Sequence, residues 1–332
     1  MTVPRPDRIA ALADRLPLLR RRALLLRAVR AFFRARGVEE VETPFLVPNP
    51  GEEVHLRPFR TELEGPDGSR ERRWLHTSPE FGMKRIVAAT GLPVFQLARV
   101  WRNNEAGPTH SPEFTMLEWY RPGFDMAALM DETEELLRAV LPPAPVRHGR
   151  GLDLDQPFER LTMADAFHRY ANCADLLDTA GNVAALAAAA GTTPRPGEDW
   201  EDLFFRLLLE RVEPAIGRDR PCFLTHWPAA QAALARRDPA DGRAALRFEL
   251  YAAGLELANG FDELTDPVEQ RSRFLSDRAR RLALDPNLDW PVDEALLAAL
   301  PSLPACSGIA LGFDRLAMLA TGARSIADLS WD

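Results

Sequence analysis

Apolar residues recur along the chain at two spacings, one typical of helices and one typical of strands. Between residues 17 and 36, apolar side chains from Leu18 to Phe33 recur at helical intervals, which predicts an amphipathic helix that ends at Gly37. Residues 38–46 predict a strand interrupted by Pro44. The other predicted strands are 57–62, 72–76, 93–101, 113–121, 221–226, 246–252, 254–260 and 306–313. The other predicted helices are 78–90, 125–140, 163–170, 182–190, 200–212, 267–284 and 314–321.

The order of these elements indicates the fold class. Strand pairs joined by short loops, with helices between the groups, are typical of an antiparallel sheet with packed helices, so the sequence predicts an α+β fold. Residues 142–157 are rich in proline, glycine and aspartate and predict a linker or a surface excursion. The length of 332 residues allows either two domains or one large enzyme domain.

Composition narrows the class of protein. Apolar residues make up 46% of the chain and charged residues 27%, which excludes a disordered, coiled-coil or collagen-like chain. No apolar run approaches the about 18 residues that span a bilayer, and residues 1–7 lack an apolar signal core. Three scattered cysteines are too few for a disulfide framework. We therefore expect a soluble, cytoplasmic protein that does not bind membranes.

Charge adds two observations. The net charge of −8 argues against a surface that coats nucleic acid. Among 41 basic residues, Lys84 is the single lysine, as a GC-rich genome would favour. The helix at 17–36 nevertheless carries an arginine face without acids, which is open to three interpretations: a transit peptide, a helix that binds RNA or membrane, or a solvated face. We favour the solvated face, because the helix runs directly into ordered structure. The arginines are Arg20, Arg21, Arg22, Arg27, Arg30, Arg34 and Arg36.

The densest group of polar residues lies around the loop between the strands 93–101 and 113–121. Arg102 follows the first strand, and a guanidinium there suits a phosphate group. On the second strand, Phe114, Glu118 and Tyr120 share one face, because side chains alternate along a strand. The alternative is a surface hairpin that carries only a salt bridge.

Two further segments carry candidate chemistry. Glu256 and Glu263 lie among apolar residues, and carboxylates that are buried require a cation: a metal, an arginine or a ligand amine. Glu249 and Glu256 suit magnesium, although pairing with arginine would also satisfy them. The segment 308–315 is an apolar strand with small residues that ends at Arg315, which suits a second phosphate. The sequence has no glycine-rich phosphate loop.

Together, in this order, these segments closely resemble the class II aminoacyl-tRNA synthetases. Residues 17–46 resemble motif 1, which forms a dimer interface in that family, 98–120 resemble motif 2, and 306–321 resemble motif 3. The segments 77–80, 112–120 and 259–264 resemble the lysyl branch. The resemblance implies one catalytic domain over 1–332, built on an antiparallel sheet flanked by helices, with an insertion at about 142–230.

The chain resembles a truncated group within that branch, the elongation factor P–lysine ligases. Fewer than forty residues precede Gly37, so we expect no anticodon-binding domain. Ala310 also resembles this group, because tRNA-charging relatives usually have glycine there. The resemblance implies ATP- and Mg²⁺-dependent activation of lysine or (R)-β-lysine as an acyl-adenylate, and transfer to a lysine of elongation factor P. It also implies a homodimer without stable tRNA binding. The alternatives are a minimal enzyme that charges tRNA and a non-catalytic regulatory subunit.

The resemblance also assigns residues to roles. Arg102 and Arg315 would be catalytic, binding the α- and γ-phosphates, and Phe114 would stack on adenine. Glu263 and Tyr120 would lie nearest the side-chain ammonium of the substrate, and Glu249 and Glu256 would bind magnesium. The expected ATP-binding residues are Arg102, Asn103, Asn104, Glu105, His110, Ser111, Phe114, Glu249, Leu250, Gly312 and Arg315. The expected substrate-binding residues are Ser78, Pro79, Glu80, Glu118, Tyr120, Glu256, Asn259, Phe261, Glu263 and Ala310.

Two positions depart from the motif 2 pattern of the family. Asn104 occupies the place of the usual glutamate, with Glu105 following, and Ser111 replaces the asparagine after the histidine. Both departures lie on the nucleotide side, so they bear on adenine recognition rather than on the phosphate-binding arginines.

Overall fold

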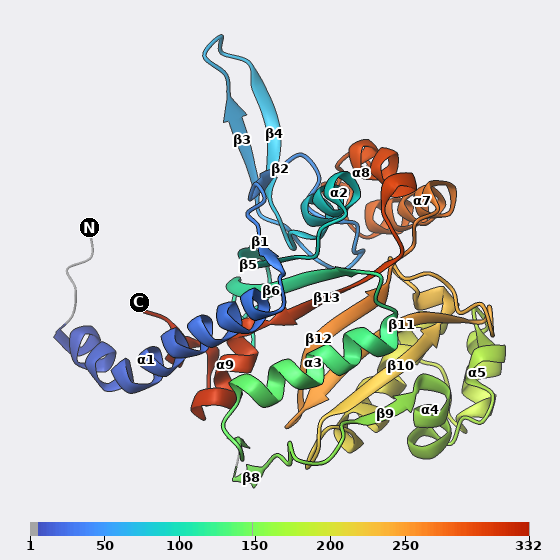
Figure 1. The fold of residues 1–332 in the computed structure, drawn as a ribbon. Coiled ribbons are helices and arrows are strands. Elements are labelled where there is room, and N and C mark those ends of the chain that lie inside the picture. The colour runs from blue at the N-terminus through green and yellow to red at the C-terminus, as the bar shows by residue number, and fades with distance from the viewer. Residues whose placement is uncertain (1–5, 148, 332) are drawn as a thin grey trace.

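One large sheet organises the molecule. The structure is a computed structural model that describes residues 6–147 and 149–331 (Figure 1). The predicted lack of a signal core at residues 1–7 therefore falls mostly outside the described chain. In the described residues the main sheet has eight strands. In spatial order these are β1 (Glu39–Glu40), β5 (Val94–Trp101), β6 (Glu113–Pro122), β13 (Cys306–Gly312), β12 (Leu255–Asp262), β11 (Ala244–Ala252), β10 (Cys222–Pro228) and β9 (Glu159–Thr162).

The pairing confirms the predicted α+β class and refines the sheet. The strands from β5 to β10 are antiparallel, whereas β1 joins β5 and β9 joins β10 in parallel at the two edges. The sheet brings β13 between β6 and β12, although these strands are far apart in the sequence. The three segments with candidate chemistry are therefore direct neighbours.

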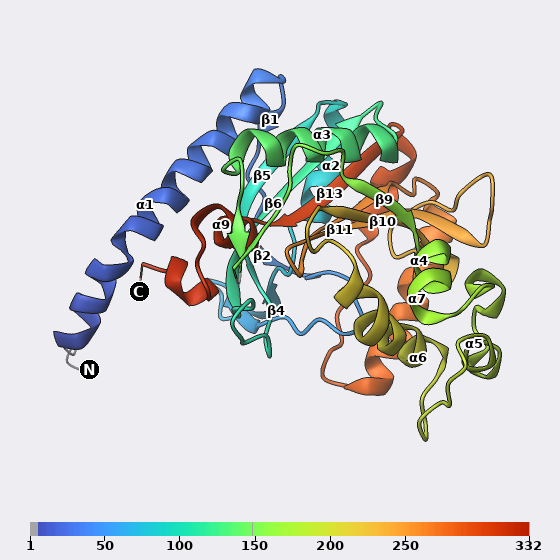
Figure 2. The ribbon, with the colours of Figure 1, turned by 90° about the horizontal axis from the view of Figure 1, so that it is seen from below.

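Helices α1 (Pro6–Ala35), α3 (Met126–Val140) and α9 (Phe313–Thr321) cover one face of this sheet (Figures 1 and 2). Their apolar sides form the main core with the sheet, where Phe33 stacks on Phe95 with ring centroids 4.7 Å apart. Leu152 and Leu154 are also buried in this core. Most of the other described residues of 142–157 are exposed and few belong to regular elements, as expected of a surface excursion, and these two side chains anchor the segment to the body. The short hairpin β7 (Val146–Arg147) and β8 (Arg150–Gly151) precedes them.

The predicted insertion at 142–230 builds one end of the main sheet. It contributes β9 and β10, and its helices α4 (Met163–Ala171), α5 (Val183–Ala189) and α6 (Trp200–Leu207) form a second core. In that core Phe167 stacks on Phe204 with centroids 5.1 Å apart. The predicted helix 200–212 ends its α-helical part at Leu207 and continues as a π-helical turn over Leu208–Val212.

The remaining elements are three helices and a small second sheet. Helices α2 (Glu80–Thr90), α7 (Pro267–Leu284) and α8 (Glu294–Ala299) lie together, and a small sheet of β2 (Leu46–Val47), β4 (Arg70–Leu75) and β3 (Arg60–Glu64) projects from the body (Figure 1). Four sequence expectations change here. The strand at 38–46 shrinks to β1 and β2 around Pro44, which has no amide to donate. The helix predicted at 78–90 begins at Glu80 with Pro79 as its N-cap residue, while the Ser78 hydroxyl accepts from the amide of Glu80. The sequence did not predict β9 and α8.

The described helices also bear on the membrane expectation. None of them is both long enough and apolar enough to span a bilayer.

Candidate active site

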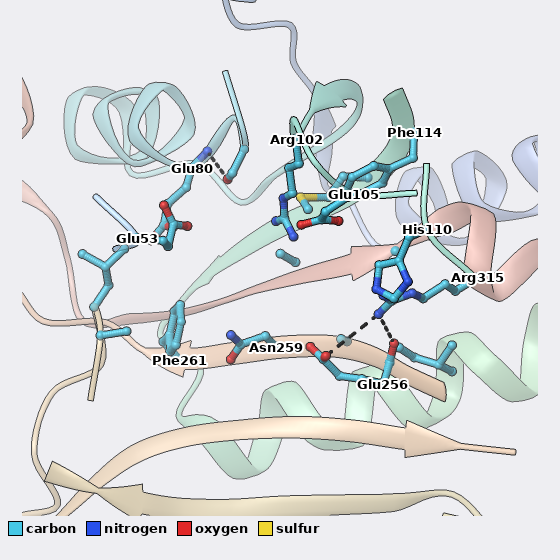
Figure 3. A pocket seen from close by; sticks show the side chains of 18 of the residues that line it. Glu53, Glu80, Arg102, Glu105, His110, Phe114, Glu256, Asn259, Phe261 and Arg315 are labelled. Atoms are coloured by element: carbon cyan, nitrogen blue, oxygen red, sulfur yellow. Dashed lines mark hydrogen bonds and ion pairs between the residues drawn. The ribbon is translucent and has the colours of Figure 1, made fainter. Parts of the chain in front are cut away.

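A cavity of about 290 Å³ opens beside β6, β13 and β12 (Figure 3). Its walls bring together thirteen of the residues that the sequence singled out. These are Ser78, Glu80, Arg102, Glu105, His110, Ser111, Phe114, Glu256, Asn259, Phe261, Ala310, Gly312 and Arg315. Arginine side chains lie toward one end of the cavity, and Glu53 and Glu80 lie toward the other (Figure 3).

The arginine end contains an available guanidinium. Arg102 lies 5.3 Å from the ring centroid of Phe114 and makes only a long hydrogen bond, 3.4 Å, to the Thr77 carbonyl. No ion pair neutralises its charge among the described side chains. Arg102 is therefore free to bind an anion, and Phe114 offers a ring beside it for a planar ligand.

Arg315 is fixed in place by the loop before β6 and by β12. Its Nη2 donates to Nε2 of His110 at 2.7 Å, and its Nη1 donates to the Glu256 carbonyl at 2.7 Å. Burial, reinforced by Arg315, lowers the pKa of His110, so the imidazole is neutral and accepts at Nε2. The side chain of Glu256 is 44% exposed and stands 3.9 Å from Arg315, which corrects the expectation that Glu256 is buried.

The other end presents acidic and polar groups on neighbouring strands. Asn259 on β12 is directly opposite Ala310 on β13, which in turn is opposite Glu118 on β6. The Ala310 methyl therefore separates the amide of Asn259 from the carboxyl of Glu118 on this surface. Gly308 has a similar position next to Tyr120, where an added Cβ would stand 2.3 Å from the tyrosine ring.

Glu118 and Tyr120 lie beneath the cavity rather than on its wall. Glu118 is fully buried and accepts from Ser78 at 2.5 Å and from Tyr120 at 3.2 Å. Burial, followed by repulsion from Glu80, raises the pKa of Glu118 to about 8. Its carboxyl group is therefore mostly protonated at neutral pH, and we infer that it supports Ser78 from below.

Glu263 also lies outside the cavity wall, because it has an internal cation. Nζ of Lys84 stands 2.6 Å from Glu263 and 2.5 Å from Glu80, and all three groups are buried or nearly so. The expectation that Glu263 and Tyr120 lie nearest a substrate ammonium stays a prediction, although neither residue lines the cavity as described. The cation that the sequence analysis required for Glu263 is a lysine of the chain itself, and Glu80 is the carboxylate that reaches the cavity.

Glu249 is engaged by the protein on both oxygens. It accepts from Arg247 at 2.7 Å and from the Tyr251 hydroxyl at 2.6 Å, and it does not line the cavity. Burial, followed by repulsion from Glu256, raises the pKa of Glu249 to about 7, so the two carboxylates lie within electrostatic reach. Among the described residues, no three acidic, histidine or cysteine side chains form a metal-binding cluster. A nucleotide-bound magnesium uses one or two carboxylates together with phosphates, and Glu256 with Glu249 behind it fits that smaller donor set.

Four other expected residues do not line the cavity. Asn103 and Asn104 are exposed on the loop after β5, and Asn104 has a left-handed backbone with φ of 67°. Glu105 lines the cavity instead of these two residues. The glutamate that is displaced by one position from the usual motif 2 pattern therefore still faces the cavity. Leu250 belongs to the main core, and Pro79 caps α2.

Several residues that line the cavity were missed from the sequence. Gln270, Phe274 and Asp277 on α7 face it together, and the Nε2 of Gln270 is buried without a partner. They are four and three residues apart on one predicted helix, and this spacing indicates that they share one face of it. Arg247, which donates to Asn259 at 3.3 Å, and Glu53 gave no such signal, because each depends on how separate segments meet.

One buried ion pair joins the three segments that carried the resemblance. Asp314, at the start of α9, accepts from Arg22 of α1 at 2.7 Å and from the amide of Thr115 on β6 at 2.7 Å. Arg22 also donates to the Thr115 hydroxyl at 2.9 Å. Arg22 is therefore not part of the solvated arginine face, and it fixes α1 against the wall of the site.

Comparison with known proteins agrees with this geometry. A family model described as tRNA synthetases class II (D, K and N) matches residues 14–331. The chain belongs to the class II aminoacyl-tRNA synthetase family. Within the family, curated relatives in Klebsiella pneumoniae and Salmonella paratyphi B are named elongation factor P–(R)-β-lysine ligase. Each is 46% identical over 316 residues, covering 95% of this chain and 94% of the relative. The segments that resembled motifs 1, 2 and 3 in the sequence lie in α1 through β2, in β5 through β6, and in β13 through α9.

Proposed function

We propose that this protein is a ligase that activates (R)-β-lysine or lysine with ATP and transfers the acyl group to a lysine side chain of elongation factor P. One observation carries the proposal: a single cavity has free arginine at one end and carboxylates at the other, as an anionic nucleotide and a cationic amino acid require. The names of the curated relatives support the acceptor, and they favour (R)-β-lysine over α-lysine.

The arginine end positions ATP. Arg102 neutralises charge that develops on the α-phosphate when the substrate carboxylate attacks it, and Arg315 holds the γ-phosphate of the leaving pyrophosphate. Phe114 stacks on the adenine, and the adjacent Glu105 contacts the nucleotide in place of Asn104. Because both phosphate ligands are already oriented, catalysis rests on alignment and charge neutralisation and needs no protein nucleophile.

The acidic end positions the amino acid. Glu80 binds the side-chain ammonium of the substrate, while Ser78, Asn259 and Phe261 border its hydrocarbon part. The Ala310 methyl narrows the space between Asn259 and Glu118, so it restricts where the backbone of the substrate lies. Lys84 forms ion pairs with both Glu80 and Glu263 and so helps to hold the Glu80 carboxylate at the cavity wall.

Magnesium accompanies the nucleotide. Glu256 is the accessible carboxylate at the phosphate end, and Glu249 stands behind it on the neighbouring strand. The ion would neutralise phosphate charge there.

The test is ATP–pyrophosphate exchange measured with (R)-β-lysine, with lysine and with neither, in the absence of tRNA. We expect exchange that depends on the amino acid and on magnesium, and a mass increase of elongation factor P when it is added. Arg102→Ala should lower exchange about 10²–10³-fold, as removal of one oxyanion contact does, with the fold intact by circular dichroism. Exchange that appears only when tRNA is added would overturn the proposal in favour of a tRNA-charging enzyme.

A further inference from the structure

A second cavity of about 350 Å³ adjoins the active site. Residues 43–44 and 46–51, the start of α2 and two residues at the start of α8 are among those that line it. It shares Glu53, Ser78 and Glu80 with the main cavity, so the two meet at the acidic end. The second cavity therefore reaches this end from a side that the nucleotide end does not occupy.

The carboxylates at this junction differ in whether a cation already neutralises them. Glu80 pairs with Lys84 at 2.5 Å, and in the second cavity Asp293 pairs with Arg85 at 2.6 Å. Among the described residues Glu53 makes no ion pair, and the only hydrogen bond that acts on its carboxylate comes from its own backbone amide. Glu53 is thus the uncompensated charge at the junction, and it attracts an ammonium group.

The neighbouring carboxylate, Glu52, differs from Glu53 because it is neutralised by the protein. Glu52 is buried and accepts from Asn49 at 2.7 Å and from Arg281 at 3.0 Å, so it serves the structure. Glu53 points instead toward the junction, near Glu80 (Figure 3).

We propose that Glu53 is the general base of the transfer step and that the second cavity admits the acceptor lysine side chain. This inference rests on the proposed function, which requires a protonated lysine of elongation factor P to attack an enzyme-bound acyl-adenylate. A lysine amine is protonated at neutral pH and must lose a proton before it can attack.

The electrostatic surroundings suit this task. Glu53 lines both cavities and its surface is accessible to solvent. Desolvation by the surrounding protein, followed by repulsion from Glu80, raises the pKa of Glu53, while Arg102 opposes the rise and Asp277 adds to it. The charged groups around Glu53 are therefore Glu52, Glu80, Arg102 and Asp277. A carboxylate with a raised pKa is a stronger base, which brings it closer to the pKa of the amine that it deprotonates.

The step balances in atoms and charge. The acceptor ammonium gives one proton to the Glu53 carboxylate, and the nitrogen lone pair then forms a bond to the acyl carbon. The bond from that carbon to the phosphate oxygen breaks, and its electron pair leaves with AMP. The second proton of the attacking nitrogen passes to the AMP phosphate, which leaves an amide.

The test separates activation from transfer with Glu53→Gln. Enzyme-bound adenylate is formed first and then mixed with elongation factor P in a single turnover. We expect transfer to be slowed about 10²–10⁴-fold more than amino-acid-dependent exchange is, the usual contribution of a general base. Hydroxylamine, which is already unprotonated at neutral pH, should react with the adenylate equally fast on both proteins. Glu53→Asp should recover part of the transfer rate.

Each other outcome has a definite meaning. Unchanged transfer in Glu53→Gln would overturn the role of Glu53, as would an equal loss of exchange and transfer, which would place this residue in activation. Slow reaction with hydroxylamine as well would show a structural defect rather than a missing base. A wild-type protein that shows no exchange would overturn the proposed function, and this inference with it.

Discussion

At the scale of single residues, Lys84 shows how one charge organises the acidic end of the cavity. Its ammonium lies between Glu80 and Glu263 with only 2% of the side chain exposed. Although burial opposes it, Glu263 and then Glu80 raise the pKa of Lys84, so the group stays charged. A compact ammonium can bridge two carboxylates in this space, whereas the planar fork of arginine has a different geometry. This explains why a chain that otherwise uses arginine has lysine here.

Replacing Lys84 should therefore destabilise the fold. Lys84→Met leaves two buried carboxylates without a cation, and we expect the free energy of unfolding to fall by about 3–5 kcal/mol. Burial already raises the pKa of Glu263 to about 8, and loss of Lys84 raises it further. The part of the deficit due to Glu263 should be small well below pH 8, where Glu263 is protonated in both proteins, and should grow as the pH rises through 8 and above. Urea unfolding at about pH 6 and about pH 9 measures this.

The double variant Lys84→Met with Glu263→Gln is the control. It removes the unpaired charge together with its partner, so most of the lost stability should return. Arg85→Met, which breaks an ion pair on the next residue of α2, should show no such dependence on Glu263. If the double variant were as unstable as the single one, the ion pair would not be the cause.

At the scale of secondary structure elements, helix α1 has two distinct arginine sets. Arg22 faces inward to Asp314, whereas Arg20, Arg21, Arg27 and Arg34 are exposed. Arg30 and Arg36 are occupied by Glu40 and Glu135 at 2.8 and 2.9 Å. The exposed arginines agree with the predicted solvated face, and they form a basic surface on a protein whose net charge is −8.

We expect this surface to guide the acceptor protein. Arg27→Glu with Arg34→Glu should slow transfer to elongation factor P by about ten-fold at low salt. The reason is that attraction between opposite charges on two proteins raises the rate at which they meet. The effect should shrink at physiological ionic strength, where exposed charges are screened over about 8 Å. Stopped-flow or gel-based transfer rates at two salt concentrations test this, and adenylate formation should change little.

Arg218→Glu with Arg220→Glu is the matched control. It makes the same change of charge on exposed residues of the loop before β10. Equal slowing by both double variants would mean that total charge matters rather than α1. Equal loss of activation and transfer in the α1 variant would instead mean that these arginines support the fold or the dimer.

At the scale of the whole molecule, α1 extends past the edge of the sheet that it covers (Figure 2). Leu24 on this helix is 59% exposed, and Phe45 and Leu46 in the segment that follows β1 are also exposed. Exposed apolar side chains on the motif 1 segments favour burial against a second copy, since closed two-fold pairing is the commonest assembly.

We therefore expect a homodimer. Light scattering at micromolar concentration should give twice the chain mass of 37.1 kDa. Leu24→Glu with Phe45→Glu should shift the protein toward the monomer, because it places charge on the apolar surface. A monomeric mass for the unaltered protein would contradict the prediction.

The sequence predicted the elements that carry local signals. Helix 267–284 was predicted to its ends, because Asp266 and Pro267 start it clearly and the apolar spacing is regular. The strands 93–101 and 113–121 were predicted to within a residue, since they are long and bounded by turns. Elements of four to six residues, such as β9 and α8, were missed because they contain too few residues to show a period. The cavity residues Arg102, Arg315, Phe114 and Glu80 were also available from the sequence, because the resemblance to the class II family singled them out.

The tertiary structure alone decided which charged side chains form ion pairs with one another. The sequence required a cation for Glu263, but only folding brings Lys84 to it across 179 positions of the chain. In the same way Arg247 forms an ion pair with Glu249, and Arg22 forms one with Asp314. Glu53, at the junction of the two cavities, forms no ion pair with the described residues. Periodicity and spacing indicate which face of its own helix or strand a residue lies on. They do not indicate which residues of distant elements will be in contact. The sequence therefore determined the family, the main elements and the chemistry of each end of the cavity, while packing decided which of its charged groups remain free to act.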